Sequence, residues 1–261
     1  MPIPAPTPAT GTHFYKYSGL QRPEQLTWLR TIILENLVYL PTLDQLNDPA
    51  DGRPVVSQVP NDKMFEFLYN AGRNPTLTSA AQEKSIHNLR TYIERNGPEV
   101  MRRELSKILN RNLGGDKGFR IYSMTKRWDN LALWAKYADD YRGYCLEFVN
   151  EGQLFQPHTV EVRYEASAPI DITDPKQRSA YFLACKKSEW SNEEEVRLIR
   201  ARGGASMVLI KPEWVSRIIL GEKILVEHEK AIRELCKQRQ PELVVVKACF
   251  DPLDQTVKLK S

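Results

Sequence analysis

The chain has 261 residues, of which 41% are hydrophobic and 27% charged, and its formal net charge at pH 7 is +4. This composition is typical of a globular protein, and no apolar run reaches the roughly eighteen residues needed to span a bilayer, so we expect no membrane partner. The mild positive charge permits an anionic partner, but a dedicated nucleic-acid binder usually carries a denser basic stripe.

Residues 1–12 are predicted to form a disordered arm, because proline occupies every second position from 2 to 8. This arm has neither the basic nor the apolar segment of a signal peptide. Residues 13–261 are predicted to form a single α+β domain. The four cysteines lack CxxC spacing, which indicates reduced, mostly buried thiols in a cytoplasmic protein: Cys145, Cys185, Cys236 and Cys249.

The first part of the domain mixes strands and helices. Alternating bulky and polar residues predict a strand at 13–17, apolar residues at helical spacing predict a helix at 25–35, and a second strand follows at 37–40. The segment 46–52 is dense in Asn, Asp, Pro and Gly. It is therefore either a rigid turn or a loop whose carboxylates line a site.

A helical insertion is predicted at about 61–113. One helix begins at a capping-box pattern at 79–82 and ends at Gly97, and apolar residues from 101 to 109 predict the next. The outer face of this second helix carries three basic residues four positions apart: Arg103, Lys107 and Arg111. Such a row is either a solvated face or a stripe that follows nucleic-acid phosphates.

The central stretch 119–148 is predicted to form a strand, a short helix and a second strand. The helix would place Trp134, Tyr137, Ala138 and Tyr141 on one face before a break at 142–143. Three aromatic side chains on one stripe form either a ridge of the core or a stacking wall for a flat ligand. Residue types alone leave both interpretations open.

Strands are predicted in the last part of the chain at 159–164, 196–199 and 216–220, with helices at 176–187 and 226–239. A terminal hairpin is predicted from 243–250 and 256–260. This order lacks regular βαβ alternation, so we predict an α+β fold with a mixed, largely antiparallel β core and a helical insertion, rather than a doubly wound sheet.

Common catalytic signatures are absent from the sequence. It contains no glycine-rich dinucleotide or P-loop motif, and its four histidines have no metal-ligand spacing, so no metal is expected. In a strand, Glu193, Glu195 and Arg197 would share one face beside Trp190. Two carboxylates on one face can hold sugar hydroxyls and stabilise an oxocarbenium ion. The alternative is an exposed strand edge with a Glu–Arg pair of little energetic value.

These motifs, taken in order, resemble the bacterial and phage family catalogued as domain of unknown function 2971. The resemblance covers most of the chain after the proline-rich arm. It is carried by Tyr15-Lys16-Tyr17, Leu46-Asn47-Asp48-Pro49, Trp134-x-x-Tyr137-Ala138, Arg142-Gly143-x-Cys145-Leu146-Glu147-Phe148, Val162-x-Tyr164, Lys187-x-x-Trp190-x-x-Glu193-x-Glu195-x-Arg197 and Ile218-Ile219-Leu220-Gly221. Two positions depart from the family pattern, Ala50 and Val196.

The layout is also similar to that of the ADP-ribosyltransferase superfamily, which implies an ADP-ribosyltransferase-like fold with NAD as substrate. By that resemblance Tyr15 and Lys16 would contact the adenosine side or the pyrophosphate. Glu195 would bind the nicotinamide ribose 2′-hydroxyl and stabilise the transition state, and Glu193 would orient or deprotonate the acceptor. The remaining substrate contacts would come from Ser123, Trp134, Tyr137, Trp190 and Arg197.

The resemblance implies an enzyme that transfers ADP-ribose to an unknown protein or nucleic-acid acceptor, as a toxin, an effector or a phage-defence protein. Two alternatives remain at this point. One is a nucleic-acid-associated protein that uses the basic helix at 98–112. The other is a non-catalytic binding or scaffold domain in which Trp134, Tyr137 and Trp190 are core. The sequence leaves the oligomeric state open.

Overall fold

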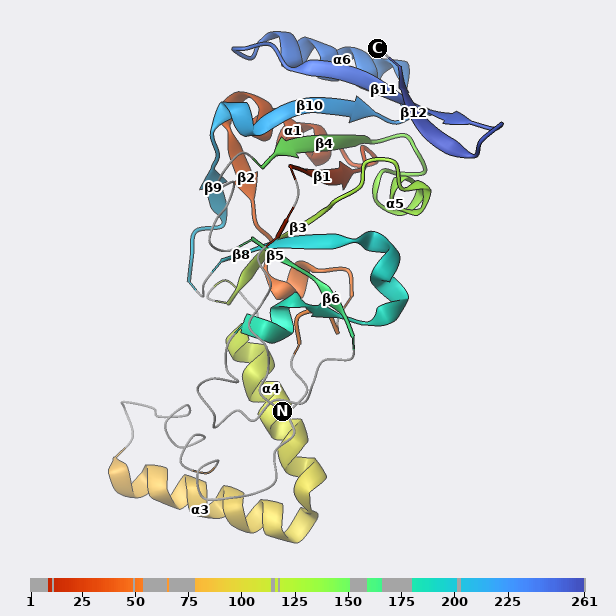
Figure 1. Ribbon diagram of the computed structural model, residues 1–261. Helices are drawn as coiled ribbons and strands as arrows, with labels where there is room; N and C mark the ends of the chain where they lie inside the picture. The colour runs from red at the N-terminus through yellow and green to blue at the C-terminus, as the bar shows by residue number, and fades with distance from the viewer. Residues whose placement is uncertain are drawn as a thin grey trace.

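The structure of the protein, a computed structural model, describes residues 9–10, 12–48, 50–53, 65, 78–113, 116, 118–150, 159–165, 180–200 and 203–260 (Figure 1). Most of the predicted proline-rich arm, the start of the insertion and the start of the helix predicted at 176–187 lie outside these residues. No helix in these ranges is long and apolar enough to cross a membrane.

The predicted mixed, largely antiparallel β core is confirmed. One eight-stranded sheet has the order β12-β11-β10-β4-β1-β3-β8-β5, and β10 and β11 are its parallel pair. Its strands are β1 (His13–Ser18), β3 (Arg120–Thr125), β4 (Tyr144–Val149), β5 (Thr159–Glu161), β8 (Glu195–Arg200), β10 (Val215–Leu220), β11 (Val244–Asp251) and β12 (Thr256–Lys260). The last two strands form the predicted terminal hairpin.

Two small sheets and five helices complete the described fold. Strand β2 (Leu37–Tyr39) pairs with β9 (Met207–Leu209), and β6 (Arg163–Tyr164) pairs with β7 (Cys185–Lys186). The helices are α1 (Pro23–Glu35), α3 (Ser79–Asn96), α4 (Pro98–Leu113), α5 (Leu131–Tyr137) and α6 (Val226–Lys237). Short 3-10 turns are η1 (Leu43–Gln45), η2 (Ala180–Ala184), η3 (Ser188–Glu193) and η4 (Pro212–Trp214).

The large sheet opens between β1 and β3. Strand β1 pairs with β4 along its whole length, and β3 pairs with β8 in the same way. Between β1 and β3 themselves, the described residues contribute one pair in register, Tyr15 with Thr125. In Figure 1 the sheet accordingly has an upper half from β12 to β1 and a lower half of β3, β8 and β5. This opening creates the space for a pocket.

Apolar side chains cover both faces of the upper half-sheet. On one face Leu29 and Ile33 of α1 and Ile232 of α6 belong to the same buried cluster as Phe14 of β1 and Ile218 of β10. On the other face α5 packs its apolar side against β1, β4 and β10. The alternation of residues along each strand sends successive side chains to opposite faces, which allows one sheet to serve both clusters.

Trp134 belongs to the second cluster and is fully buried. Its ring meets that of Tyr17 edge-on at 5.0 Å between centroids and stacks with that of Tyr141 at 6.4 Å. Its Nε1–H donates to the backbone oxygen of Trp128 over 2.8 Å. Of the two interpretations of the aromatic stripe, the structure supports the core ridge for Trp134. The side chain is not placed as a stacking wall for a ligand.

The helix that carries Trp134 is shorter than predicted. It ends at Tyr137, and residues 139 to 141 then adopt positive φ angles, so Tyr141 reaches the core from a turn. The turn ends at Gly143. This position requires glycine, because a Cβ there would lie 2.1 Å from the backbone oxygen of Ser18. A side chain at this position would push β4 away from β1.

Replacing Trp134 with Phe should lower the free energy of unfolding by about 1–2 kcal/mol, since it removes the bond to Trp128 and leaves part of the indole volume empty. Urea unfolding at neutral pH measures this change. Affinity for a ligand that binds in the opening between β1 and β3 should stay unchanged. A Trp134→Phe variant that keeps full stability but loses ligand binding would restore the stacking-wall interpretation.

The predicted helical insertion contains α3 and α4, which lie at the opposite end of the molecule from β11 and β12 (Figure 1). The start of α3 differs by one residue from the prediction. Thr78 is the N-cap, and its side chain accepts a hydrogen bond from the backbone of Ala81. Gly97, with φ of 85°, ends α3 as predicted.

One prediction for the last part of the chain needs a changed boundary, and another is wrong. The stretch 159–164 is extended as predicted, but it is divided at Val162 into β5, which pairs with β8, and β6, which pairs with β7. The described part of the helix predicted at 176–187 is instead η2 followed by strand β7. Pairing of β7 with β6 extends the backbone there and places Lys186 beside the opening of the sheet.

Candidate functional site

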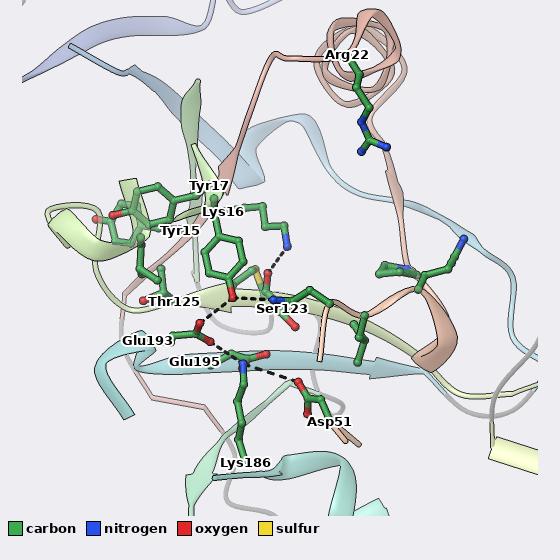
Figure 2. Close-up of a pocket in the computed structure, with 17 residues that line it drawn as sticks. Tyr15, Lys16, Tyr17, Arg22, Asp51, Ser123, Thr125, Lys186, Glu193 and Glu195 are labelled. Atoms are coloured by element: carbon green, nitrogen blue, oxygen red, sulfur yellow. Dashed lines mark hydrogen bonds and ion pairs between the residues drawn. The ribbon is translucent and has the colours of Figure 1, made fainter. Parts of the chain in front are cut away.

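A pocket of about 400 Å³ lies where the sheet opens (Figure 2). Strand β1 contributes Tyr15, Lys16 and Tyr17, and β3 contributes Ser123 and Thr125. The other polar walls come from the segment that contains η1 and residues 45–51, from α5, from β7 and from the start of β8. A pocket of this size, with several convergent polar groups, is the expected form of a small-molecule site.

Lys186 joins the two predicted catalytic glutamates. Its Nζ lies 2.6 Å from Oε2 of Glu193 and 2.9 Å from Oε2 of Glu195, and all three side chains are buried. Burial by itself lowers the pKa of Lys186, but the two carboxylates outweigh it and raise the pKa. The lysine therefore stays protonated and fixes the two glutamates relative to each other.

Arg197 also holds the carboxylate of Glu195 in place. Its side chain is 0% exposed, and its Nε and Nη2 donate to the Oε1 and Oε2 of Glu195 over 2.7 and 3.0 Å. Burial raises the pKa of Glu195, but the charge and hydrogen bonds of Arg197 outweigh it and lower the pKa to about 2. The exposed strand edge considered for this pair is wrong, because Glu195 is 5% exposed.

The polar turn at 46–52 carries a carboxylate into the site. Asp51 accepts a hydrogen bond from Nη2 of Arg197 over 2.7 Å, and its Oδ2 lies 3.7 Å from Nζ of Lys186. Burial raises the pKa of Asp51 even though Arg197 opposes this shift. Of the two interpretations of this turn, the structure supports the loop that lines a site.

Tyr137 and Lys136 hold Glu193 from the side of α5. The Tyr137 hydroxyl donates to Glu193 Oε1 over 2.7 Å, and Lys136 Nζ lies 3.1 Å from the same oxygen. Burial raises the pKa of Tyr137, so its hydroxyl stays a donor at neutral pH. The ring of Tyr137 contributes an aromatic wall to the pocket.

Cations stand across the pocket from the carboxylates. Lys16 donates from Nζ to the backbone oxygen of Ser123 over 2.8 Å and spans the gap between β1 and β3. Burial lowers the pKa of Lys16, while Glu195 and Glu193 oppose this. Figure 2 shows Arg22, at the N-cap of α1, reaching toward the pocket from the side opposite Asp51. The pocket therefore has a carboxylate side and a cationic side.

The structure brings six of the nine predicted site residues to the pocket wall: Tyr15, Lys16, Ser123, Tyr137, Glu193 and Glu195. Trp134 lies in the core, and Arg197 acts through Glu195 and Asp51. Trp190, predicted as a substrate contact, is not among the residues that line the pocket and packs against lysines, with Lys136 Nζ 3.6 Å and Lys186 Nζ 5.3 Å from its ring centroid.

Glu193 also differs from its prediction. It ends η3 and is not part of strand β8, and Glu194 follows in the left-handed conformation with φ of 43°. The two catalytic candidates therefore do not share a strand face. They meet because the left-handed residue turns the chain between them and because both bind Lys186.

Three residues of the site were missed in the sequence. Asp51 was visible as one carboxylate of the polar turn, and Lys186 as the first lysine of the pair that precedes Trp190. Arg22 gave no signal of its own, since it stands in a polar segment before a helix. Their importance depends on chain segments that meet only in the folded protein.

The basic row predicted on the insertion is partly described. Arg103 and Lys107 of α4 have exposed side chains, and the side chain of Arg111 lies outside the described residues. Within the described part of the chain, no group of three or more His, Cys, Asp and Glu residues is arranged to hold a metal ion.

In comparisons with known proteins, no family model, no curated protein and no solved structure matches the chain. The function is therefore inferred from the geometry of the pocket and from the sequence motifs.

Proposed function

We propose that the protein binds NAD in this pocket and cleaves the bond between nicotinamide and ribose, transferring ADP-ribose to an acceptor. The resemblance to the family of domain of unknown function 2971 and to ADP-ribosyltransferases motivates this proposal. The observation that carries it is the buried carboxylate of Glu195, which accepts hydrogen bonds from Arg197 and Lys186 in a pocket that opens within the sheet.

Cleavage needs a fixed negative charge. When the bond from ribose C1′ to the pyridinium nitrogen breaks, its electron pair leaves with neutral nicotinamide and the ribose becomes an oxocarbenium ion. The pKa of Glu195, at about 2, keeps this carboxylate charged at neutral pH. It can accept a hydrogen bond from the ribose 2′-hydroxyl and stabilise the developing charge without reorganising, which is an efficient form of electrostatic catalysis.

The polarity of the pocket orients the substrate. Lys16 and Arg22 on the cationic side fit the diphosphate, while the carboxylate side accepts the ribose and the pyridinium. The acceptor nucleophile would then attack C1′ and lose its proton. Glu193 lies beside Glu195 and would orient that nucleophile through the oxygens it already shares with Tyr137 and Lys186. An acceptor on a host or phage molecule would make the protein a toxin, an effector or a defence factor.

NAD should raise the melting temperature of the protein, and purified protein should release nicotinamide from NAD. Arg22→Gln should weaken NAD binding by about tenfold, because it removes one charge-assisted contact to a phosphate. Arg30→Gln is the matched control, since Arg30 is an exposed arginine of the same helix that pairs with Glu35. Calorimetric titration of the three proteins measures the difference.

Absence of both a thermal shift and nicotinamide release would contradict the proposal. The alternative function would then be tested by binding to a polynucleotide. If the basic face of α4 binds nucleic acid, binding should weaken with salt and with the double substitution Arg103→Gln and Lys107→Gln.

A further inference from the structure

Glu193 is held by three hydrogen-bond donors in the wall of the pocket. The Tyr137 hydroxyl donates to its Oε1 over 2.7 Å, and Lys136 Nζ donates to the same oxygen over 3.1 Å. Lys186 Nζ donates to Oε2 over 2.6 Å (Figure 2). A carboxylate has about four positions for a donor, two on each oxygen, so Oε1 is fully occupied and Oε2 keeps one position. Because Glu193 lines the pocket, this is the position left for a ligand.

The occupied positions on Glu193 restrict the acceptor. A guanidinium binds a carboxylate best through two parallel hydrogen bonds, one to each oxygen. Tyr137 and Lys136 block this arrangement, because both already donate to Oε1. A hydroxyl group has a single O–H to donate, so it needs only the position that remains on Oε2.

The charges around Glu193 also disfavour a cationic acceptor. The carboxylates at this centre, with Asp51 included, are balanced by Lys136, Lys186 and Arg197. An incoming cation therefore gains little net attraction. At Glu193 it would also lie beside the two ammonium groups, which repel it.

Proton transfer favours a hydroxyl acceptor as well. An arginine side chain is protonated at neutral pH and must lose a proton before its nitrogen can attack, and a carboxylate is a much weaker base than guanidine. A hydroxyl oxygen can attack C1′ with a lone pair while it still carries its proton. As the bond from C1′ to nicotinamide breaks and the bond to this oxygen forms, the O–H becomes strongly acidic. Its proton can then pass to Oε2 of Glu193.

We propose that the acceptor nucleophile is an uncharged O–H group and that Lys136 is a specificity-determining residue that excludes guanidinium and ammonium acceptors. This inference rests on the proposed function. Lys136 is kept beside Glu193 by Trp190, whose ring centroid lies 3.6 Å from its Nζ. The two cations at Glu193 differ in their contacts, since Lys186 also binds Glu195 and Lys136 does not. Lys136 can therefore be changed without removing a contact of Glu195.

The test supplies NAD with two small acceptors at equal concentration, methanol for a hydroxyl and agmatine for a guanidinium. Chromatography gives the ratio of each ADP-ribose adduct to free ADP-ribose, which is independent of the amount of folded protein. Wild type should form at least about ten times more methyl adduct than agmatine adduct. Lys136→Met removes a charge and frees one position on Oε1, so the agmatine adduct should increase by about tenfold or more.

Lys126→Met is the matched control. The Lys126 side chain is 32% exposed, against 35% for Lys136, and it pairs with Glu161 over 2.7 Å outside the pocket. This variant should keep the product ratios of wild type.

The outcomes separate this inference from the proposed function. An agmatine adduct as abundant as the methyl adduct in wild type would overturn the inference and leave NAD cleavage standing. Unchanged product ratios in Lys136→Met would remove Lys136 from its role. Free ADP-ribose without either adduct in wild type would support an uncharged O–H group, since water would then be the nucleophile. Absence of nicotinamide release under all these conditions would overturn the proposed function together with the inference.

Discussion

Glu195→Gln should lower the rate of nicotinamide release from NAD by at least about a hundredfold to a thousandfold, the range found when one electrostatic contact to a transition state is lost. The amide keeps the size of the side chain but removes the charge that the oxocarbenium ion needs. NAD affinity should change far less, because the charge develops mainly in the transition state. Release is measured by chromatography of single-turnover reactions, with NAD binding checked by calorimetry.

The neighbouring glutamate supplies the control for this experiment. Glu194 is exposed and pairs with Arg127 over 3.5 Å outside the pocket, so Glu194→Gln should retain full release. Glu195→Gln also loses part of its bonding to Arg197 and Lys186, which should lower the free energy of unfolding by about 1–3 kcal/mol. Nicotinamide release should therefore be assayed well below the melting temperature of Glu195→Gln. Retained release in folded Glu195→Gln would remove Glu195 from the catalytic role.

Local sequence patterns predicted most of the elements of the fold. Alternation marked β1, and helical spacing marked α1 and α6, because both patterns depend on which face of a short segment is buried. The opening between β1 and β3 could not be predicted in this way. These strands are about a hundred residues apart in the chain, and nothing in either one records that they pair at Tyr15 and Thr125 alone.

The candidate site shows the same limit. Glu193 and Glu195 were recognisable because they stand close together in the sequence, but their burial was not. A run of three glutamates suggests a solvated edge, and the interpretation changes only when Lys186, which comes from another segment, and Arg197 compensate the charge. Buried charge is therefore a property of the assembled fold, and local residue types predict it poorly.

Arg197→Met should lower the free energy of unfolding at pH 7 by about 3–5 kcal/mol, the usual cost of removing one partner of a buried ion pair. Methionine fills similar space, so the loss comes from charge. Glu195 and Asp51 would be left buried with Lys186 as their remaining cation at this centre. Arg200→Met, a half-buried arginine at the end of the same strand, should cost far less. Urea unfolding of the three proteins measures both changes.

The pH dependence separates this electrostatic cause from a packing defect. In wild type the pKa of Glu195 is about 2, below its ordinary value of 4.5, so the stability it contributes is fully present above pH 4.5 and is lost as the pH falls toward 2. Without Arg197, burial should raise the pKa of Glu195 above 4.5, and that of Asp51 further above 3.8. Protonation of these two carboxyls would then remove buried, unpaired charge from the variant, whereas in wild type it removes the stability that ionised Glu195 contributes. The difference in unfolding free energy between wild type and Arg197→Met should therefore narrow from pH 7 to pH 4. A difference that stays constant over this range would mean that Arg197 stabilises the fold by packing, and that Glu195 does not depend on it to remain ionised.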